Sequence, residues 1–168
     1  FKPEFSLQED IGIDYSSEHL SVNISLFNND ISNYIYNQKV LNAQGLDSIT
    51  QGNQTFQFRQ STASLQGGEA SIDIHPHPFD WLHFENGISV VYGVNNGGNG
   101  IKVNDSGKYL PFIPPLHFTS ELRGNFKQPS KYLKNAFVKI QMLYYARQDR
   151  VYLAYDTETP TPGYTLCN

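Results

Sequence analysis

Three histidines, His75, His77 and His83, lie close together in the segment HPHPFDWLHF, which begins at His75. Neutral imidazole is a common ligand of zinc and copper ions. His75 and His77 are two residues apart and could share one face of a strand, with His83 across a turn. One interpretation of this spacing is therefore a metal site, or a metal-dependent enzyme built on it.

The same segment also fits a turn between two strands, and we favour this interpretation. Pro76 and Pro78 have no backbone N–H to donate to a sheet, so they are typical of an edge or a turn. Asp73, Asp80 and Glu85 lie near in the sequence, but the segment has no cysteine and no complete four-ligand pattern. We therefore predict no bound metal and no cofactor.

A second group with chemical potential is His117, Glu121 and Arg123, which share one face of an expected strand. A histidine beside a carboxylate could perform acid–base chemistry. No nucleophile motif or repeated carboxylate motif accompanies the group, and a polar strand face explains it equally well. We predict that the three residues line a polar surface and that the protein is not an enzyme.

Composition restricts the protein class. The net charge is -4 and the twelve Lys and Arg residues are scattered, which argues against a nucleic-acid partner. The single cysteine, Cys167, excludes an internal disulfide. Aromatic residues make up 14% of the chain although its mean hydropathy is -0.46. Strands with one apolar and one polar face would produce this combination.

Alternation with a period of two recurs along the chain and predicts an all-β fold. For example, Val22, Ile24 and Leu26 face one way, whereas Asn23 and Ser25 face the other. We expect an antiparallel up-and-down meander of about six to seven long strands. The strands should lie near residues 5–15, 19–36, 55–76, 81–93, 112–126 and 134–150, with a seventh beginning at 161.

The expected connections alternate in length. Short ones lie at 16–18, 77–80 and 127–134, and long polar ones at 37–55, 94–110 and 149–162. In a meander, all short turns would lie at one end of the sheet and all long loops at the other. This asymmetry is typical of an outer-membrane barrel with extracellular long loops.

Aromatic side chains concentrate near the expected strand ends. We interpret them mainly as girdles at the two membrane–water interfaces, with Phe79 and Trp81 at the turn end. Eight tyrosines lie toward the long loops: Tyr34, Tyr36, Tyr92, Tyr109, Tyr144, Tyr145, Tyr152 and Tyr155. Some tyrosine and amide side chains there could contact a ligand. The candidate ligand-binding residues are Tyr36, Asn42, Gln44, Asn95, Asn96, Tyr109 and Tyr155.

Five segments, in order, resemble the late barrel strands of TonB-dependent outer-membrane receptors. They are FKPEFSLQEDIGIDY, LFNNDISNYIY, LQGGEASIDIHPHPFDWLHF, LPFIPPLHFTSELR and TPGYTLCN. They resemble the family's Lys-Pro-Glu strand start, its Asn-Asp-Ile strand end, its proline-bearing turn with a Trp-Leu restart, its Ile-Pro-Pro segment and its Thr-Pro-Gly-Tyr strand opening. The resemblance covers nearly the whole chain.

The resemblance implies a 22-stranded transmembrane β-barrel in the outer membrane of a Gram-negative bacterium, with an N-terminal plug and a TonB box. Such receptors take up scarce nutrients such as iron-siderophores, haem, cobalamin or glycans, and TonB drives them through the plug. We expect residues 1–168 to be a partial barrel segment that lacks the plug, the TonB box, the early strands and the final strands. Its partners would be TonB, the nutrient and outer-membrane lipid.

A different class of protein also fits the alternation, namely a soluble all-β binding module, for example for carbohydrate. This alternative requires a closed apolar core. A barrel segment alone would instead leave two strand edges and an apolar stripe uncovered, which promotes association. We predict that the isolated chain either curls into a small barrel or sandwich or pairs with another copy.

Overall fold

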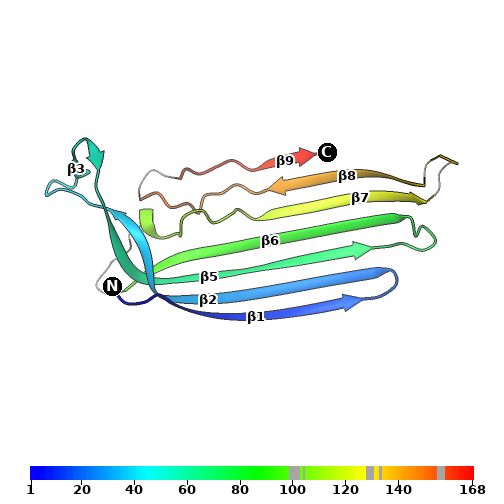
Figure 1. Cartoon of the computed structure of the whole chain (residues 1–168), viewed down its shortest axis with the longest axis horizontal. Helices are drawn as coiled ribbons and strands as arrows, with labels where there is room; N and C mark the ends of the chain where they lie inside the picture. Colours follow the sequence, from blue (N-terminus) through cyan, green and yellow to red (C-terminus); the bar gives the residue numbers. More distant parts are fainter. Residues whose placement is uncertain (99–102, 104, 128–130, 133, 155–157) are drawn as a thin grey trace.

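The computed structural model describes residues 1–98, 103, 105–127, 131–132, 134–154 and 158–168. Seven strands form one antiparallel sheet in the order β1-β2-β5-β6-β7-β8-β9 (Figure 1). A separate hairpin pairs β3 (Ile49–Thr50) with β4 (Asn53–Gln54), and η1 (Asp105–Gly107) is a single 3-10 turn. The sheet strands are β1 (Phe5–Ser16), β2 (Leu20–Lys39), β5 (Phe56–Ile74), β6 (Leu82–Gly97), β7 (His117–Lys127), β8 (Asn135–Tyr145) and β9 (Tyr164–Cys167).

The prediction of an all-β antiparallel meander is confirmed, because each strand of the large sheet pairs with the sheet strand next to it along the chain. The largest differences from the expected bounds concern β7, β8 and the loop 37–55. β7 begins at His117 rather than near residue 112, since Pro111, Pro114 and Pro115 cannot donate to a ladder. β8 ends at Tyr145 rather than near residue 150, and the expected loop 37–55 contains the β3–β4 hairpin.

The two ends of the sheet differ as the sequence predicted. The β1–β2, β5–β6 and β7–β8 connections lie at one end, which we call the turn end (Figure 1). The β2–β5, β6–β7 and β8–β9 connections lie at the other, which we call the loop end. There β2 and β5 turn away from the line of the other strands and carry the β3–β4 hairpin.

The register gives the sheet two chemically distinct faces, because residues paired across strands point to the same side. One row runs through Ile13, Ile24, Ala70 and Ile88. We call this side the apolar face. Large apolar side chains on it remain exposed in this chain: Ile11, Ile13, Ile24, Leu26, Ile88, Leu122, Val138, Ile140 and Met142.

The opposite side, which we call the polar face, carries hydroxyl, amide and charged side chains toward the turn end. One row runs through Asp73, Glu85, Glu121 and Gln141. A shallow hollow of about 550 Å³ lies along this face and reaches from Asp14 to Gln141. The apolar face also contains two polar residues, Asn86 and Ser120, which pair with each other.

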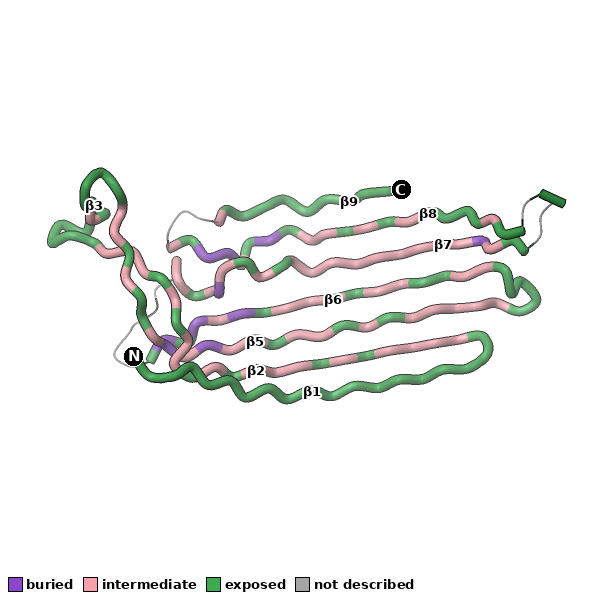
Figure 2. Tube along the Cα trace, in the orientation of Figure 1, coloured by how far each residue is buried: buried purple, intermediate pink, exposed green. Residues whose placement is uncertain are grey.

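Burial is confined almost entirely to the loop end (Figure 2). The buried apolar side chains of the described residues are Ala63, Leu110, Val151 and Tyr152, and the buried polar ones are Ser61, Asn95 and Gln148. The sheet is a single open layer, so the structure shows neither the small barrel nor the sandwich that was one of the two predicted alternatives for the isolated chain. Pairing with another copy stays a prediction.

The proline-rich segment forms the β5–β6 turn, as predicted. Phe79 donates its backbone N–H to Pro76, and Leu82 donates to Phe79. Trp81 stacks on Phe126 of β7 with 5.3 Å between ring centroids. Among the described residues, the structure has no helix of the length and apolarity needed to cross a membrane.

Candidate functional site

An aromatic pocket of about 400 Å³ lies at the loop end, a volume within the range of small-molecule sites. The residues that line it come from β2, the start of β5, the end of β6 and the two connections β6–β7 and β8–β9. Six of its ten lining residues are aromatic. The lining residues are Tyr34, Tyr36, Asn37, Phe56, Asn95, Tyr109, Leu110, Pro111, Phe112 and Tyr152.

A β-bulge places the tyrosines of β2 in this pocket. The pairing of β2 with β5 shifts between Ile31 and Tyr34, so two residues of β2 stand opposite one of β5. Asn33, inside the bulge, has a φ of 58°, a left-handed conformation that asparagine tolerates better than most residues. Because one extra residue reverses the alternation, Tyr34 and Tyr36 point to the polar face. Their rings stack, with centroids 6.0 Å apart.

The β6–β7 connection forms one wall by continuing to pair with β6. Leu110 donates its N–H to the carbonyl of Gly93, and Asn95 donates to Lys108. The Ile113 side chain lies directly over Gly93, where an added Cβ would be 2.8 Å from Ile113 Cδ1. Glycine at this position therefore lets the connection pack closely onto the polar face.

The β8–β9 connection supplies Tyr152 and is held to the β6–β7 connection by side chains. Glu158 accepts hydrogen bonds from the backbone N–H groups of Phe112 and Tyr152. The buried Gln148 donates to the carbonyl of Ile113 at 2.8 Å. These bonds pair backbone groups that would otherwise be left unsatisfied beside the pocket.

The chemistry of the aromatic pocket is stacking and hydrogen bonding. Its lining residues, as far as the structure describes the chain, include four phenol groups and two amides but no carboxylate, imidazole or sulfur ligand. Such a lining suits an organic ligand with flat or apolar surfaces and a few polar groups. It does not suit a bare metal ion, because metal ions require such ligand atoms in number.

Three of the predicted ligand-binding residues, Tyr36, Asn95 and Tyr109, are brought together in the aromatic pocket. Asn95 also has a structural role, because its side-chain oxygen accepts the N–H of Gly97 at 3.0 Å. The sequence reasoning missed Phe56, Phe112 and the contribution of Pro111. A signal was present for Tyr34, which lies two residues from Tyr36 and shares its face.

Of the other four predicted residues, three lie in the described part of the chain and do not line the aromatic pocket. Asn42 shapes a turn, because its side-chain oxygen accepts the N–H groups of Gln44 and Leu46. Gln44 belongs to that same exposed turn. Asn96 points to the opposite side from Asn95 and donates to Ser64 Oγ at 3.2 Å. Tyr155 lies outside the described residues.

The tyrosines predicted as a girdle divide between two environments. Tyr92 and Tyr144 lie on the apolar face near the loop end and are exposed. Tyr145 lies on the polar face, where it stacks between the rings of His117 and Tyr164. Of the remaining five, Tyr155 lies outside the described residues, and four line the aromatic pocket: Tyr34, Tyr36, Tyr109 and Tyr152.

His117, Glu121 and Arg123 share the polar face, as predicted, but each contacts a different partner on β8. Glu121 accepts from Lys139 at 3.0 Å and from Gln141 at 3.2 Å. Arg123 lies over the Phe137 ring, 4.8 Å from its centroid. The three side chains therefore do not converge on one point, and a polar wall describes them better than an acid–base centre.

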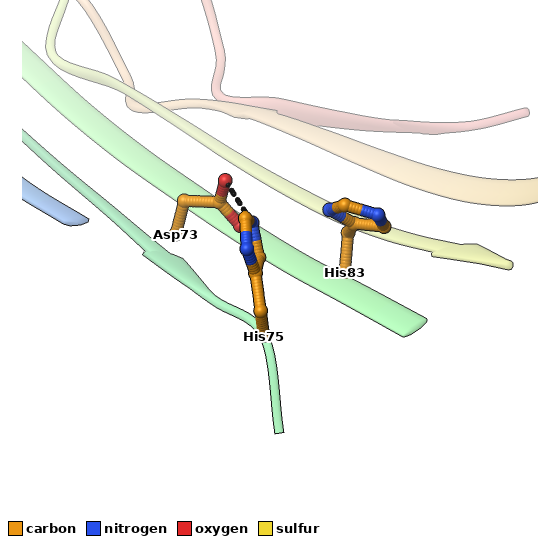
Figure 3. Close-up of side chains that lie close together, drawn as sticks. All are labelled: Asp73, His75 and His83. Carbon is orange, nitrogen blue, oxygen red and sulfur yellow. Dashed lines mark hydrogen bonds and ion pairs between the residues drawn. The ribbon is translucent and has the colours of Figure 1, made fainter. Parts of the chain in front are cut away.

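The histidines are arranged differently from the predicted trio. Asp73, His75 and His83 offer ligand atoms that all lie within 4.8 Å of one another, and we call these three residues the histidine cluster (Figure 3). His77 is not part of it. Its ring lies 5.6 Å from that of His19, and its Nδ1 is 3.5 Å from Asp80. β5 ends at Ile74 and the turn closed by the Phe79–Pro76 hydrogen bond begins at Pro76, so His77 lies in the turn and does not continue the strand face of His75.

Comparisons with known proteins agree with this architecture. A family model described as "TonB dependent receptor-like, beta-barrel" matches residues 1–168. Among solved structures, the chain is similar to one described as "Copper transporter OprC", with a TM-score of 0.71 and 17% sequence identity. The match covers 99% of this chain and 22% of that chain, so this chain spans about a fifth of that protein's length. None of the curated proteins matches the sequence.

Proposed function

The chain belongs to the TonB-dependent receptor-like β-barrel family, and from this premise we propose that it forms part of the barrel wall of an outer-membrane nutrient receptor. The apolar face would contact lipid in the outer membrane of a Gram-negative bacterium. The polar face would line the barrel lumen. The long connections would be extracellular, and the short turns would face the periplasm.

The observation that carries this proposal is the band of exposed apolar side chains on one face of the sheet. Contiguous apolar surface of this kind is rare on proteins surrounded by water and is typical of a lipid contact. On β6 the band extends from Phe84 to Tyr92, about 26 Å along the strand at 3.3 Å per residue, which at the usual tilt of about 35–45° spans about 19–21 Å of the membrane. An outward apolar band about 25 Å tall is usual in such barrels.

The same observation argues against the soluble binding module. That alternative requires two sheets, or a closed barrel, with the apolar side chains packed inside. In this chain the buried residues instead gather under the loop end, and the apolar face lies open.

We propose that the aromatic pocket helps to capture an organic nutrient from outside the cell. Iron-siderophore complexes, haem, cobalamin and glycans all present rings or sugar faces that aromatic side chains can stack against. The similar solved structure is described as a copper transporter. The described residues that line the aromatic pocket include no carboxylate, imidazole or sulfur ligand for a bare copper ion, and we propose a larger organic cargo, with or without a chelated metal.

Transport in this proposal involves no chemical step on the nutrient. TonB would supply the energy by acting on the plug of the complete receptor, and this chain would contribute wall and loops. The chain is therefore proposed to act as a transporter part and not as an enzyme.

The experiment that tests the function compares cells that make the complete receptor with cells that do not. Both are supplied separately with a ferric siderophore, haem, cobalamin and oligosaccharides as limiting nutrients. We expect receptor-dependent uptake of one class, which disappears when TonB is removed. If all four nutrient classes are taken up equally by cells with and without the receptor, the proposal is contradicted.

A further inference from the structure

We propose that the histidine cluster, Asp73, His75 and His83, binds a divalent transition-metal ion, Zn²⁺ or Cu²⁺. The cluster lies on the polar face at the turn end, remote from the aromatic pocket. The proposal goes beyond the receptor function and does not depend on it, because it concerns only three side chains and an ion.

The backbone brings these residues together in a simple way. Asp73 and His75 are two residues apart, so they point to the same side of β5 and its extension. Ile74 pairs with Phe84, and the same register places His75 opposite His83. The two imidazole rings lie 4.4 Å apart at an angle of 69° (Figure 3). The cluster is therefore fixed by strand pairing and not by a loop.

The polar atoms of Asp73 provide an independent sign of a ligand. Its Oδ2 lies 2.6 Å from His75 Nε2. Its Oδ1 atom is covered and has no hydrogen-bond partner among the described residues, although the Asp73 side chain as a whole is 31% exposed. A buried carboxylate oxygen without a partner is costly, and a bound cation would satisfy it.

The donor set matches zinc or copper rather than calcium or magnesium. Two imidazoles and one carboxylate are ligands of Zn²⁺ and Cu²⁺, whereas Ca²⁺ and Mg²⁺ prefer oxygen ligands alone. In a tetrahedral zinc site with bonds of about 2.0–2.1 Å, ligand atoms lie about 3.3 Å apart. Side-chain movements of roughly 1.5 Å would close the longest separations, which are at most 4.8 Å, whereas Asp73 Oδ2 and His75 Nε2, now 2.6 Å apart, would have to separate by about 0.7 Å and exchange their hydrogen bond for bonds to the ion.

The electrostatic surroundings also favour a cation. Glu85 pairs directly opposite Asp73 on the same face. Two carboxylates in this position repel each other, and a cation beside them offsets the repulsion. Arg123 pairs opposite His83, but its guanidinium lies over Phe137 on β8, the far side of β7 from His83.

Three protein ligands leave a coordination position open. Closed structural zinc sites have four protein ligands, whereas sites with three keep a position for water or another ligand. The ion in this cluster could therefore exchange, or could be completed by a side chain from another part of the receptor.

The test is a titration of the purified complete receptor, carrying no histidine tag, with Zn²⁺ and separately with Cu²⁺ by calorimetry. The variants are His83→Ala and Asp73→Asn, and the control is His77→Ala, which changes a neighbouring exposed histidine outside the cluster. We expect His83→Ala and Asp73→Asn to weaken one site at least tenfold, since substitution of outer partners alone costs about 10–100-fold. His77→Ala should bind as the wild type does.

Electron paramagnetic resonance of the Cu²⁺-loaded receptor gives a readout that a folding defect would not imitate. We expect coupling to two imidazole nitrogens in the wild type and to one in His83→Ala. Unchanged metal affinity in His83→Ala, or an equal loss in His77→Ala, would overturn the proposal. Nutrient uptake is a separate measurement, so failure here leaves the receptor function to be judged by its own experiment.

Discussion

Replacing Ile140 by arginine should destabilise the folded receptor in a bilayer, by up to about 2–4 kcal/mol, which is the usual cost of arginine on the lipid face at the midplane. Ile140 is 65% exposed and lies between Val138 and Met142 on the apolar face, with Leu122 opposite it on β7. In the proposed barrel this surface contacts only lipid. The arginine side chain would therefore lose its hydration without gaining a partner.

The matched control is Gln141→Arg, one residue further along β8. Gln141 lies on the polar face opposite Glu121, so an arginine there gains a carboxylate partner and should change stability by less than about 1 kcal/mol. The measurement is the free energy of unfolding of the complete receptor in phospholipid bilayers, from a denaturant titration. Equal effects of the two variants, or a larger effect of Gln141→Arg, would show that the faces have been assigned wrongly.

Removal of the Tyr36 ring should weaken nutrient binding at least tenfold. Tyr36 lines the aromatic pocket and stacks with Tyr34, so Tyr36→Ala removes both a contact surface for the ligand and the support of a second ring. Tyrosines in desolvated contacts often contribute more than 1.4 kcal/mol, which corresponds to a factor of ten in affinity. The measurement is the dissociation constant of the purified receptor for the nutrient identified by the uptake experiment.

Two variants control this prediction. Tyr36→Phe keeps the ring and should bind within a few-fold of the wild type. Asn96→Ala changes a loop-end residue that contacts Ser64 and does not line the pocket, so its affinity should be unchanged. If Tyr36→Ala binds normally, or if Asn96→Ala is equally weak, then the aromatic pocket is not where the nutrient binds.

The strands could be predicted from the sequence because the alternation of apolar and polar residues within each strand identifies its two faces. The alternation of Val22, Ile24 and Leu26 with Asn23 and Ser25 reflects local geometry with a period of two. The same holds for the separation into short turns and long loops, which depends only on where the alternation stops. Family resemblance then indicated what the apolar face contacts.

The candidate site was harder to predict because it depends on contacts between distant segments. The alternation alone would place Tyr36 on the apolar face, and only the bulge at Asn33 turns it toward the pocket. Glu158 joins the β6–β7 and β8–β9 connections, which are separated by two strands, and no local sequence pattern predicts this role. At the turn end, the sequence suggested His77 as the third member of the histidine group, but the structure places Asp73 beside His75 and His83. The reason is that the proline-rich turn takes His77 away from the strand, which the spacing alone does not reveal.

The central claim is that the chain spans the outer membrane with its loop end outside the cell. We would test it with single cysteines and a membrane-impermeant maleimide in intact cells, in a Cys167→Ser background because Cys167 is an exposed free thiol. Gln44→Cys reports the loop end, and Glu18→Cys reports the turn end; both positions are exposed. We predict that Gln44→Cys is labelled in intact cells and that Glu18→Cys is labelled only after the outer membrane is permeabilised. Labelling of Glu18→Cys in intact cells would contradict the account.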